Sequence, residues 1–231
     1  MPKLVEIVGP PGSGKTFISS ELQKTKKKGK QIYFHSSDSR NFYKFKNLNF
    51  TTKFFIKIKV IITIINFYLI FYKRLFFKKI YKREFFYRTI LLIYRHLHSI
   101  EMLKKILSDD EFLIMEPGII MYFLQDYFYA NKSISKNEIK KFNKYFLKSD
   151  FVIYSNCNSK LQLKRLKLRV RGLPQRMRDL SISEINRSIK KANYETKKYF
   201  LNTTNFNFKL IKIDTTKSIK EVKKKIFRII N

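Results

Sequence analysis

The stretch Leu4-Val-Glu-Ile-Val-Gly-Pro-Pro-Gly-Ser-Gly-Lys-Thr-Phe17 (LVEIVGPPGSGKTF) lies almost at the start of this 231-residue chain and decides its fold. The apolar run at residues 4–8 is typical of a short buried strand, and residues 16–26 read as a helix. The spacing G-x-x-x-x-G-K-[ST] is completed between them by two glycines, a lysine and a threonine: Gly9, Gly14, Lys15 and Thr16. A strand, a glycine-rich loop and a helix in this order predict a phosphate-binding loop.

The physical chemistry of such a loop suits ATP together with Mg²⁺. Glycines let the backbone turn tightly, so that successive N–H groups point inward, and the helix N-terminus adds partial positive charge. Lys15 is expected to reach the β- and γ-phosphates, and Thr16 to offer its hydroxyl to the metal ion. The residues expected to contact the nucleotide are those of the loop and the first helical turn: Gly9, Pro10, Pro11, Gly12, Ser13, Gly14, Lys15, Thr16 and Phe17.

The composition fits one α/β domain spanning residues 1–231, with 44% hydrophobic residues to build a core. Lys and Arg number 50 against 17 Asp and Glu, a net charge of +33 that favours anionic partners. AT-rich coding also enriches Lys, Asn, Ile, Phe and Tyr, so the charge has a compositional explanation too. A single cysteine, Cys157, excludes an internal disulfide and a cysteine-cluster metal site. Because a strand and a phosphate loop occupy the N-terminus, we expect no signal peptide and a cytoplasmic protein.

Five segments have the composition of strands, and helical segments separate them. This βαβα pattern predicts a mostly parallel sheet flanked by helices. The expected strands are residues 4–8, 31–35, 112–115, 151–155 and 208–213. Capping-box spacing predicts helix starts at four pairs: Ser135/Glu138, Ser159/Gln162, Ser181/Glu184 and Ser218/Glu221. Gly29 and Gly172 stand where glycines that end helices are expected.

A long insertion at residues 41–107 separates the second and third expected strands and is rich in Phe, Tyr, Ile and Lys. Most of it has helical spacing, but residues 54–72 fit either a strand or a helix. Lys57 and Lys59 leave only residues 60–72 uncharged, too few to cross a bilayer. Two interpretations stay open for the insertion, a helical subdomain on the acceptor side and a peripheral contact with an anionic membrane.

An acidic residue, Glu116, directly follows the third expected strand in Phe-Leu-Ile-Met-Glu-Pro-Gly (residues 112–118). In doubly wound sheets ligands bind at the carboxyl ends of strands, so Glu116 is expected to face the phosphate loop. There it would hold Mg²⁺, through water, or act as the base toward an acceptor hydroxyl. The alternative is a surface glutamate that opens the following helix.

Arginines concentrate late in a chain that otherwise prefers lysine: Arg165, Arg169, Arg171, Arg176 and Arg178. Arg165 and Arg169 are four residues apart and therefore share a helix face. Guanidinium groups match phosphate oxygens in two-point contacts, so residues 165–180 are expected to form a lid that neutralises the transferring group. Each arginine alone is equally consistent with a solvated side chain.

Polar residues after the second expected strand give a weaker signal. Asp38 and Arg40 are candidates to hold an acceptor, with Asp38 accepting a hydroxyl proton, and a polar turn is the equal alternative. His35 is interpreted as a strand-end polar residue rather than a catalyst. His96 and His98 are two apart and do not share a helix face, so they make a poor metal pair.

Residues 9–16, Glu116-Pro-Gly, the Arg165/Arg169 helix and the late strand FKLIKID before Thr215 together resemble the P-loop nucleoside and nucleotide kinase superfamily, of the thymidylate- and adenylate-kinase-like type. The resemblance covers residues 1–38 and 110–231. It implies a three-layer P-loop NTPase fold with a five-stranded parallel sheet in the order 2-3-1-4-5, Mg-ATP as cofactor and an arginine-bearing lid. It places Lys15 and Thr16 on the phosphates and Mg²⁺, Glu116 at the acidic position after strand three, Arg165, Arg169 and Arg176 in the lid, and Thr215 near the adenine.

The sequence departs from the thymidylate kinases at two places. Glu-Pro-Gly replaces their Asp-Arg-Tyr/His, and their acceptor signature after strand two is missing, so the acceptor is not fixed by the resemblance. The leading hypothesis is a small-molecule kinase for a nucleoside, nucleotide or sugar-like acceptor. The first alternative is a P-loop ATPase or switch coupled to a partner or an anionic membrane. A nucleic-acid kinase or binder is the second, less favoured alternative.

Overall fold

The chain was examined as a computed structural model, which describes residues 2–24, 32–35, 48–76, 83–109, 111–129, 133–146, 149–169, 172–174, 177–203 and 208–230. Its elements in chain order are β1 (Lys3–Val8), α1 (Lys15–Lys24), β2 (Ile32–His35), α2 (Phe50–Phe76), α3 (Arg83–Ile106), β3 (Phe112–Met115), α4 (Ile119–Tyr129), α5 (Lys136–Phe146), β4 (Phe151–Asn156), α6 (Ser159–Lys167), α7 (Ile182–Leu201), β5 (Lys209–Asp214) and α8 (Ile219–Ile230). Five positions discussed above lie outside the described residues: Gly29, Asp38, Arg40, Arg171 and Arg176.

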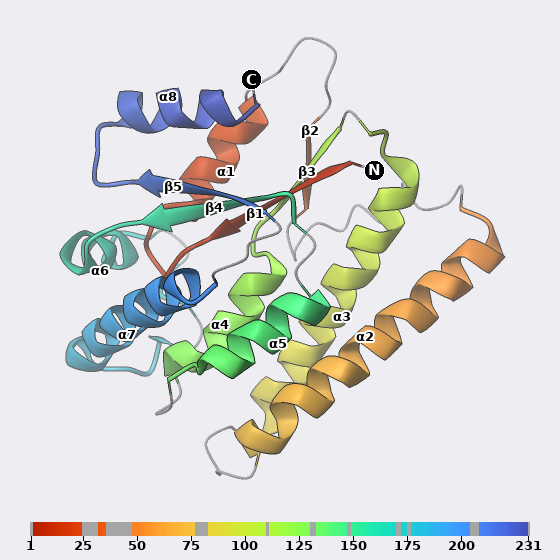
Figure 1. The fold of residues 1–231 in the computed structure, drawn as a ribbon. Coiled ribbons are helices and arrows are strands. Elements are labelled where there is room, and N and C mark those ends of the chain that lie inside the picture. Colours follow the sequence, from red (N-terminus) through yellow and green to blue (C-terminus); the bar gives the residue numbers. More distant parts are fainter. Residues whose placement is uncertain are drawn as a thin grey trace.

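The five strands form one parallel sheet in the order β2-β3-β1-β4-β5 (Figure 1). This confirms the predicted α/β fold and strand order, and each expected strand lies within one residue of its observed bounds. β1 is central, with Glu6 beside Met115 of β3 on one edge and Val152 of β4 on the other. Every parallel neighbour needs a crossover connection, which is why helices cover both faces.

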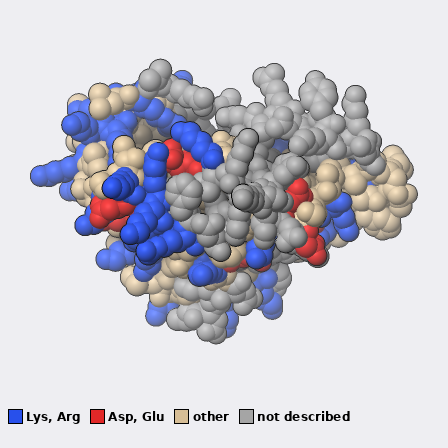
Figure 2. Space-filling model, turned by 90° about the horizontal axis from the view of Figure 1, so that it is seen from above, with Lys and Arg blue, Asp and Glu red and all other residues tan. Residues whose placement is uncertain are grey.

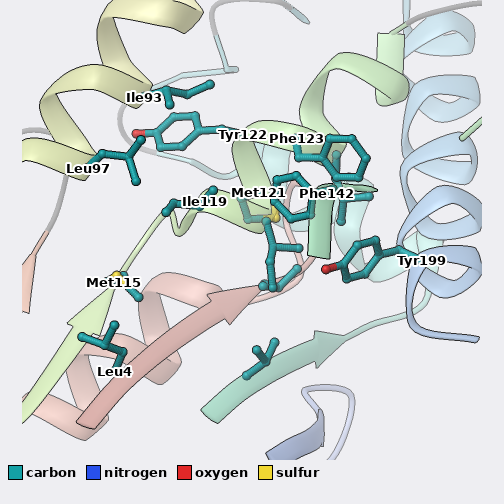
Figure 3. Packing of buried hydrophobic residues seen from close by; sticks show 14 of the residues in the cluster. Leu4, Ile93, Leu97, Met115, Ile119, Met121, Tyr122, Phe123, Phe142 and Tyr199 are labelled. Carbon is teal, nitrogen blue, oxygen red and sulfur yellow. The ribbon is translucent and has the colours of Figure 1, made fainter. Parts of the chain in front are cut away.

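Alternation along β1 assigns its side chains to two cores. Val5 and Ile7 pack in a smaller cluster with Ile18 of α1 and Val222 of α8. On the opposite face Leu4 belongs to a larger cluster, which α3, α4, α5 and α7 complete. Figure 3 shows its aromatic centre, where the rings of Phe123 and Phe142 stack at 4.1 Å and Tyr199 packs edge-on against both. One helix of the larger cluster, α4, also lines the site described below.

Three of the four predicted capping boxes are confirmed. In each box the serine hydroxyl accepts from the glutamate backbone N–H and the glutamate carboxylate accepts from the serine backbone N–H: Ser135/Glu138, Ser181/Glu184 and Ser218/Glu221. The prediction at Ser159/Gln162 is wrong. The N-cap of α6 is Asn158, whose side chain accepts from Leu161 N at 2.8 Å, because Gln162 is buried and turns to Cys157 and Asn193 instead.

The ambiguous part of the insertion is helical. α2 includes residues 54–72, and it runs antiparallel beside α3 on the outside of the molecule (Figure 1). The alternation of Ile56, Ile58 and Val60 fits a helix because Ile56 and Val60, four residues apart, are buried while Ile58 faces outward. Within the described ranges, no helix is both long enough and apolar enough to cross a bilayer.

A buried carboxyl group on β1 makes the stability of the fold depend on pH. Glu6 is 1% exposed, accepts from Ile120 N at 3.1 Å at the start of α4, and receives the Ser149 hydroxyl at 2.9 Å. Burial raises the pKa of Glu6 from 4.5 to about 7, against the opposing effect of these hydrogen bonds. Between these pH values the folded chain holds a proton that the unfolded chain has released, so stability falls as pH rises.

Replacing Glu6 with Gln removes this titration and keeps an acceptor for the α4 backbone. The free energy of unfolding of Glu6→Gln, relative to the unmodified chain, is expected to rise by up to about 3 kcal/mol between pH 4.5 and pH 8. Urea unfolding of both proteins at several pH values across that interval measures the difference. Parallel pH profiles would show that folding leaves the pKa of Glu6 unchanged.

Candidate functional site

The glycine-rich loop between β1 and α1 has a backbone that other residues cannot easily adopt. Gly12 and Gly14 have φ angles of +77° and +93°, in the left-handed region. A Cβ at Gly12 would lie 2.7 Å from Gln162 O of α6, and a Cβ at Gly9 would lie 2.6 Å from Ser155 O. The glycines of the motif are therefore required both by conformation and by the close approach of α6 and β4.

Two hydroxyl groups from neighbouring strand ends hold the loop in place. Ser155 Oγ of β4 donates to Ser13 O at 2.6 Å, and Thr215 Oγ1, directly after β5, donates to the same oxygen at 2.7 Å. Both partners are buried, so these bonds are shielded from water. The loop is fixed by the carboxyl ends of the sheet, and the N–H groups at the start of α1 remain available to a ligand.

Lys15, the first residue of α1, lies over the loop. Its Nζ donates to Gly9 O at 2.7 Å and to Pro10 O at 2.9 Å. Burial lowers the pKa of Lys15 from 10.5 to about 8, while Glu116 raises it and Arg169 lowers it further. The charged form of a lysine in this setting is strongly stabilised when an anion replaces the neutral carbonyl groups as its partner.

Glu116 lies where the sequence predicts, beside the loop. It follows β3, and its Oε1 accepts from Thr16 Oγ1 at 3.0 Å. The other oxygen, Oε2, accepts from Ser19 Oγ at 2.5 Å. Sequence reasoning missed Ser19, although it stands three residues after Thr16 and so shares its helix face. Hydroxyl and carboxylate oxygens are the ligands that Mg²⁺ prefers, so Thr16 and Glu116 suit this ion.

No cluster of three His, Cys, Asp or Glu side chains suited to a metal ion occurs in the part of the chain that the structure describes. The two histidines of α3 pack against rings. His96 lies edge-on to Tyr122 and His98 stacks on Tyr94, with ring centroids 5.5 and 5.8 Å apart.

These groups line an open cavity of about 360 Å³. The loop and the turn after β3 contribute Lys15, Thr16 and Glu116, and the α6 region contributes two arginines, Arg165 and Arg169. α4 closes a third side with three residues that sequence reasoning missed, spaced i, i+4 and i+7 on one helix face: Met121, Gln125 and Phe128. The described residues lining the cavity are Pro11, Gly12, Gly14, Lys15, Thr16, Glu116, Pro117, Met121, Gln125, Phe128, Arg165, Leu166, Arg169 and Pro174. None of these belongs to the insertion.

Five residues predicted to contact the nucleotide are not among the described residues that line the cavity: Gly9, Pro10, Ser13, Phe17 and Thr215. Their contact with a nucleotide stays a prediction. Phe17 is half-buried and packs against the smaller core cluster, away from the cavity. The side chain of Ser13 is fully buried, and its backbone carbonyl accepts the hydrogen bonds from Ser155 and Thr215 that hold the loop. Asp38 and Arg176 are outside the described residues, and their predicted roles stay predictions.

The two arginines of the α6 region differ in how they are held. Arg165 Nη2 donates to Thr215 O at 2.8 Å and Nη1 to Thr215 Oγ1 at 3.0 Å, while Nη1 lies 3.5 Å from Cys157 Sγ. Arg169, beyond the end of α6, is exposed and lowers the pKa of Lys15. Arg165 therefore braces the loop after β5, and Arg169 presents its charge to the cavity.

This difference predicts that two matched substitutions change the free energy of unfolding by different amounts. Arg165→Ala is expected to lower the free energy of unfolding by about 1–3 kcal/mol, because it leaves Thr215 without its charged donor. Arg169→Ala is expected to change it by less than about 0.5 kcal/mol, as for an ordinary exposed site. Urea denaturation of the two variants side by side measures both values. Equal losses would mean that the two guanidinium groups share one role.

Comparison with known proteins agrees on the fold. No family model and no curated protein matches the chain. Among solved structures, deoxyadenosine kinase from M. mycoides with bound dATP is 16% identical, covers 99% of both chains and has a TM-score of 0.54. Shikimate kinase from Bacteroides thetaiotaomicron is 10% identical over 98% of this chain and 96% of its own, with a TM-score of 0.46. The first likeness shows that the chain shares the overall fold of this deoxyadenosine kinase, with the parallel sheet flanked by helices that the sequence predicted.

Proposed function

We propose that this chain, which has the fold of the P-loop nucleoside and nucleotide kinases, is a phosphotransferase that uses Mg-ATP and a small-molecule acceptor. One observation carries the proposal. Lys15, Thr16, Glu116 and Arg169 line one open cavity, where Thr16 donates to Glu116 and the charges of Glu116 and Arg169 act on Lys15. Phosphoryl transfer needs positioning and charge neutralisation more than covalent chemistry, and this arrangement offers both.

Each residue has a distinct task in this proposal. The N–H groups at the start of α1 and the Lys15 ammonium bind the β- and γ-phosphates. Thr16 and Glu116 would hold Mg²⁺, which would supply charge neutralisation when bound with ATP. Arg169 balances the charge that develops on the transferring group. The proton of an acceptor hydroxyl goes to Glu116, directly or through water, because it is the carboxylate nearest to the loop in the cavity.

α4 provides the acceptor side of the cavity. Gln125, which is half-buried, offers an amide suited to the edge of a planar ring, whereas Phe128 is 2% exposed and contributes to the apolar wall. The structural neighbour with bound dATP is a deoxyadenosine kinase, which makes nucleosides the first acceptors to try. Nucleotides and sugars follow, since the resemblance stated above does not fix the acceptor.

The test begins with calorimetry of the full chain with ATP, with and without Mg²⁺. Magnesium-dependent binding is the expected result, and its absence would remove the proposal. A screen of nucleosides, nucleotides and sugars with labelled ATP then identifies the acceptor. If ATP binds and is hydrolysed but no acceptor is phosphorylated, the ATPase or switch alternative replaces the kinase.

A further inference from the structure

The helix α2 exposes an unusual number of large apolar side chains. Their exposed fractions run from 39% at Ile58 to 83% at Phe50. We call these residues the outer stripe of α2: Phe50, Phe54, Phe55, Ile58, Ile61, Ile62 and Ile65. Scattered exposed apolar residues need no explanation, but a contiguous group of this size on one element indicates a binding surface.

The outer stripe is continuous on the helix surface. At about 100° per residue, its members fall within about 140° of the helix circumference. Ile56 and Val60 are buried and lie on the opposite side, where α2 packs against the rest of the molecule. Figure 1 shows α2 as the outermost element on its side, with α3 on its inner face. Among the residues that the structure describes, packing therefore accounts for one face of α2 and leaves the outer stripe exposed.

Positive charge borders the outer stripe on both sides. By the same helical spacing, Lys57 lies next to one edge and Lys59 next to the other, and both are exposed. Lys59 also pairs with Glu101 of α3. The 27 residues of α2 include no Asp or Glu. An apolar strip between lysines, with long stems that reach past it, is the arrangement of helices that lie in a membrane interface.

Charge argues for lipid as the occupant. A second copy of this chain would bring together two molecules of net charge +33, whereas an anionic bilayer would attract each of them. Charge alone does not single out α2. Figure 2 shows Lys and Arg spread over the described face and densest on the side of α6 and α8, while tan residues dominate the outer end on the side of α2. What distinguishes α2 is the apolar area between its lysines.

We propose that the outer stripe of α2 docks the protein on an anionic lipid bilayer. The Phe and Ile side chains enter the boundary between headgroups and acyl chains, and Lys57 and Lys59 contact lipid phosphates. The described residues that line the ATP cavity belong to the glycine-rich loop, the turn after β3, α4 and the α6 region, so docking through α2 leaves that cavity accessible. The inference stands independently of the proposed kinase activity.

The first experiment is co-sedimentation of the full chain with vesicles of phosphatidylcholine, with and without phosphatidylglycerol. Phe54→Ser, Ile58→Ser and Ile61→Ser combined in one variant are expected to weaken binding to the anionic vesicles at least tenfold. The matched control combines Ile182→Ser and Leu201→Ser on α7, which are 60% and 67% exposed. This control is expected to bind within about twofold of the unmodified chain, because α7 is not part of the stripe.

The second experiment places a reporter in the stripe, which is straightforward because the chain contains no tryptophan. With anionic vesicles, the emission of the Phe54→Trp variant is expected to shift to the blue and to be quenched by brominated acyl chains. The Leu201→Trp variant is expected to do neither. Insertion at one site and not the other locates the contact independently of affinity.

Three results would overturn the proposal. The first is tight binding of the triple serine variant to anionic vesicles, equal to that of the unmodified chain, which would assign binding to dispersed positive charge. The second is failure of the unmodified chain to bind them at all. The third is a dimer in sedimentation equilibrium without lipid that the triple variant abolishes, which would show that a second copy covers the stripe.

Discussion

Lys15→Met is expected to lower the rate of phosphoryl transfer by at least about a thousandfold while the chain stays folded. Methionine keeps the length of the side chain and removes its charge. Lys15 is the cation at the loop whose pKa burial has already lowered to about 8, so its positive charge gains most from a nearby phosphate. The measurement is the rate of ADP formation with the best acceptor, together with ATP affinity by calorimetry.

The control for this variant is Lys24→Met at the other end of the same helix. Lys24 has a side chain that is 71% exposed and pairs with Glu21 on the same helix, so its removal is expected to leave turnover unchanged within about twofold. Near-normal turnover in Lys15→Met would place the phosphates elsewhere and reject the assignment of the loop.

The lowered pKa of Lys15 predicts that the chain takes up a proton when it binds ATP. ATP brings negative charge next to the ammonium and raises its pKa above about 8, so ATP binding near pH 8 to 9 takes up a proton. Calorimetry in two buffers that differ in ionisation enthalpy measures this uptake. We expect it in the unmodified chain and expect it to vanish in Lys15→Met.

Glu116→Gln is expected to lower kcat by about a hundredfold to a thousandfold. Glutamine keeps the size of the side chain and an oxygen that accepts from Thr16, but it loses the charge that holds Mg²⁺ and the capacity to accept a proton. ATP affinity without Mg²⁺ is expected to stay the same or to increase, since a negative charge beside the phosphates is removed. Turnover across a magnesium titration, compared with ATP binding in its absence, separates the two effects.

Ser19→Ala is the matched control because Ser19 donates to the other oxygen of the same carboxylate. Its loss removes one hydrogen bond and no charge, so kcat is expected to fall by less than about tenfold. If Glu116→Gln behaves like Ser19→Ala, the carboxylate only orients Thr16 and neither binds the metal nor accepts the proton.

Local sequence was enough to predict the phosphate loop and the sheet. The loop depends on residues adjacent in the chain, Gly9 to Thr16, and its backbone geometry follows from where glycine stands. Each strand appeared as a short apolar run between helices, and right-handed crossovers restrict how such strands are ordered. Three capping boxes could be predicted because the two residues of each box are three positions apart in the chain.

Contacts between distant residues were harder to anticipate. Glu6 looks like a polar residue in a strand, and only the packing of α4 across β1 buries it and raises its pKa. Arg165 has the sequence position of a lid arginine. In the structure its guanidinium group donates to Thr215, fifty residues away, and holds the loop after β5. The capping error at Ser159 has the same origin, because the burial of Gln162 against α7 overrides its local preference.

Taken alone, the sequence predicted a glycine-rich loop between a strand and a helix at the carboxyl end of a parallel sheet, because that geometry is encoded in consecutive residues. Tertiary structure alone decided which side chains meet that loop, namely Ser19 on Glu116 and Met121, Gln125 and Phe128 of α4. It also decided which face of α2 remains uncovered. The physical reason is that burial and proximity depend on how helices pack on the sheet, and the spacing of residues along one element does not specify its neighbours.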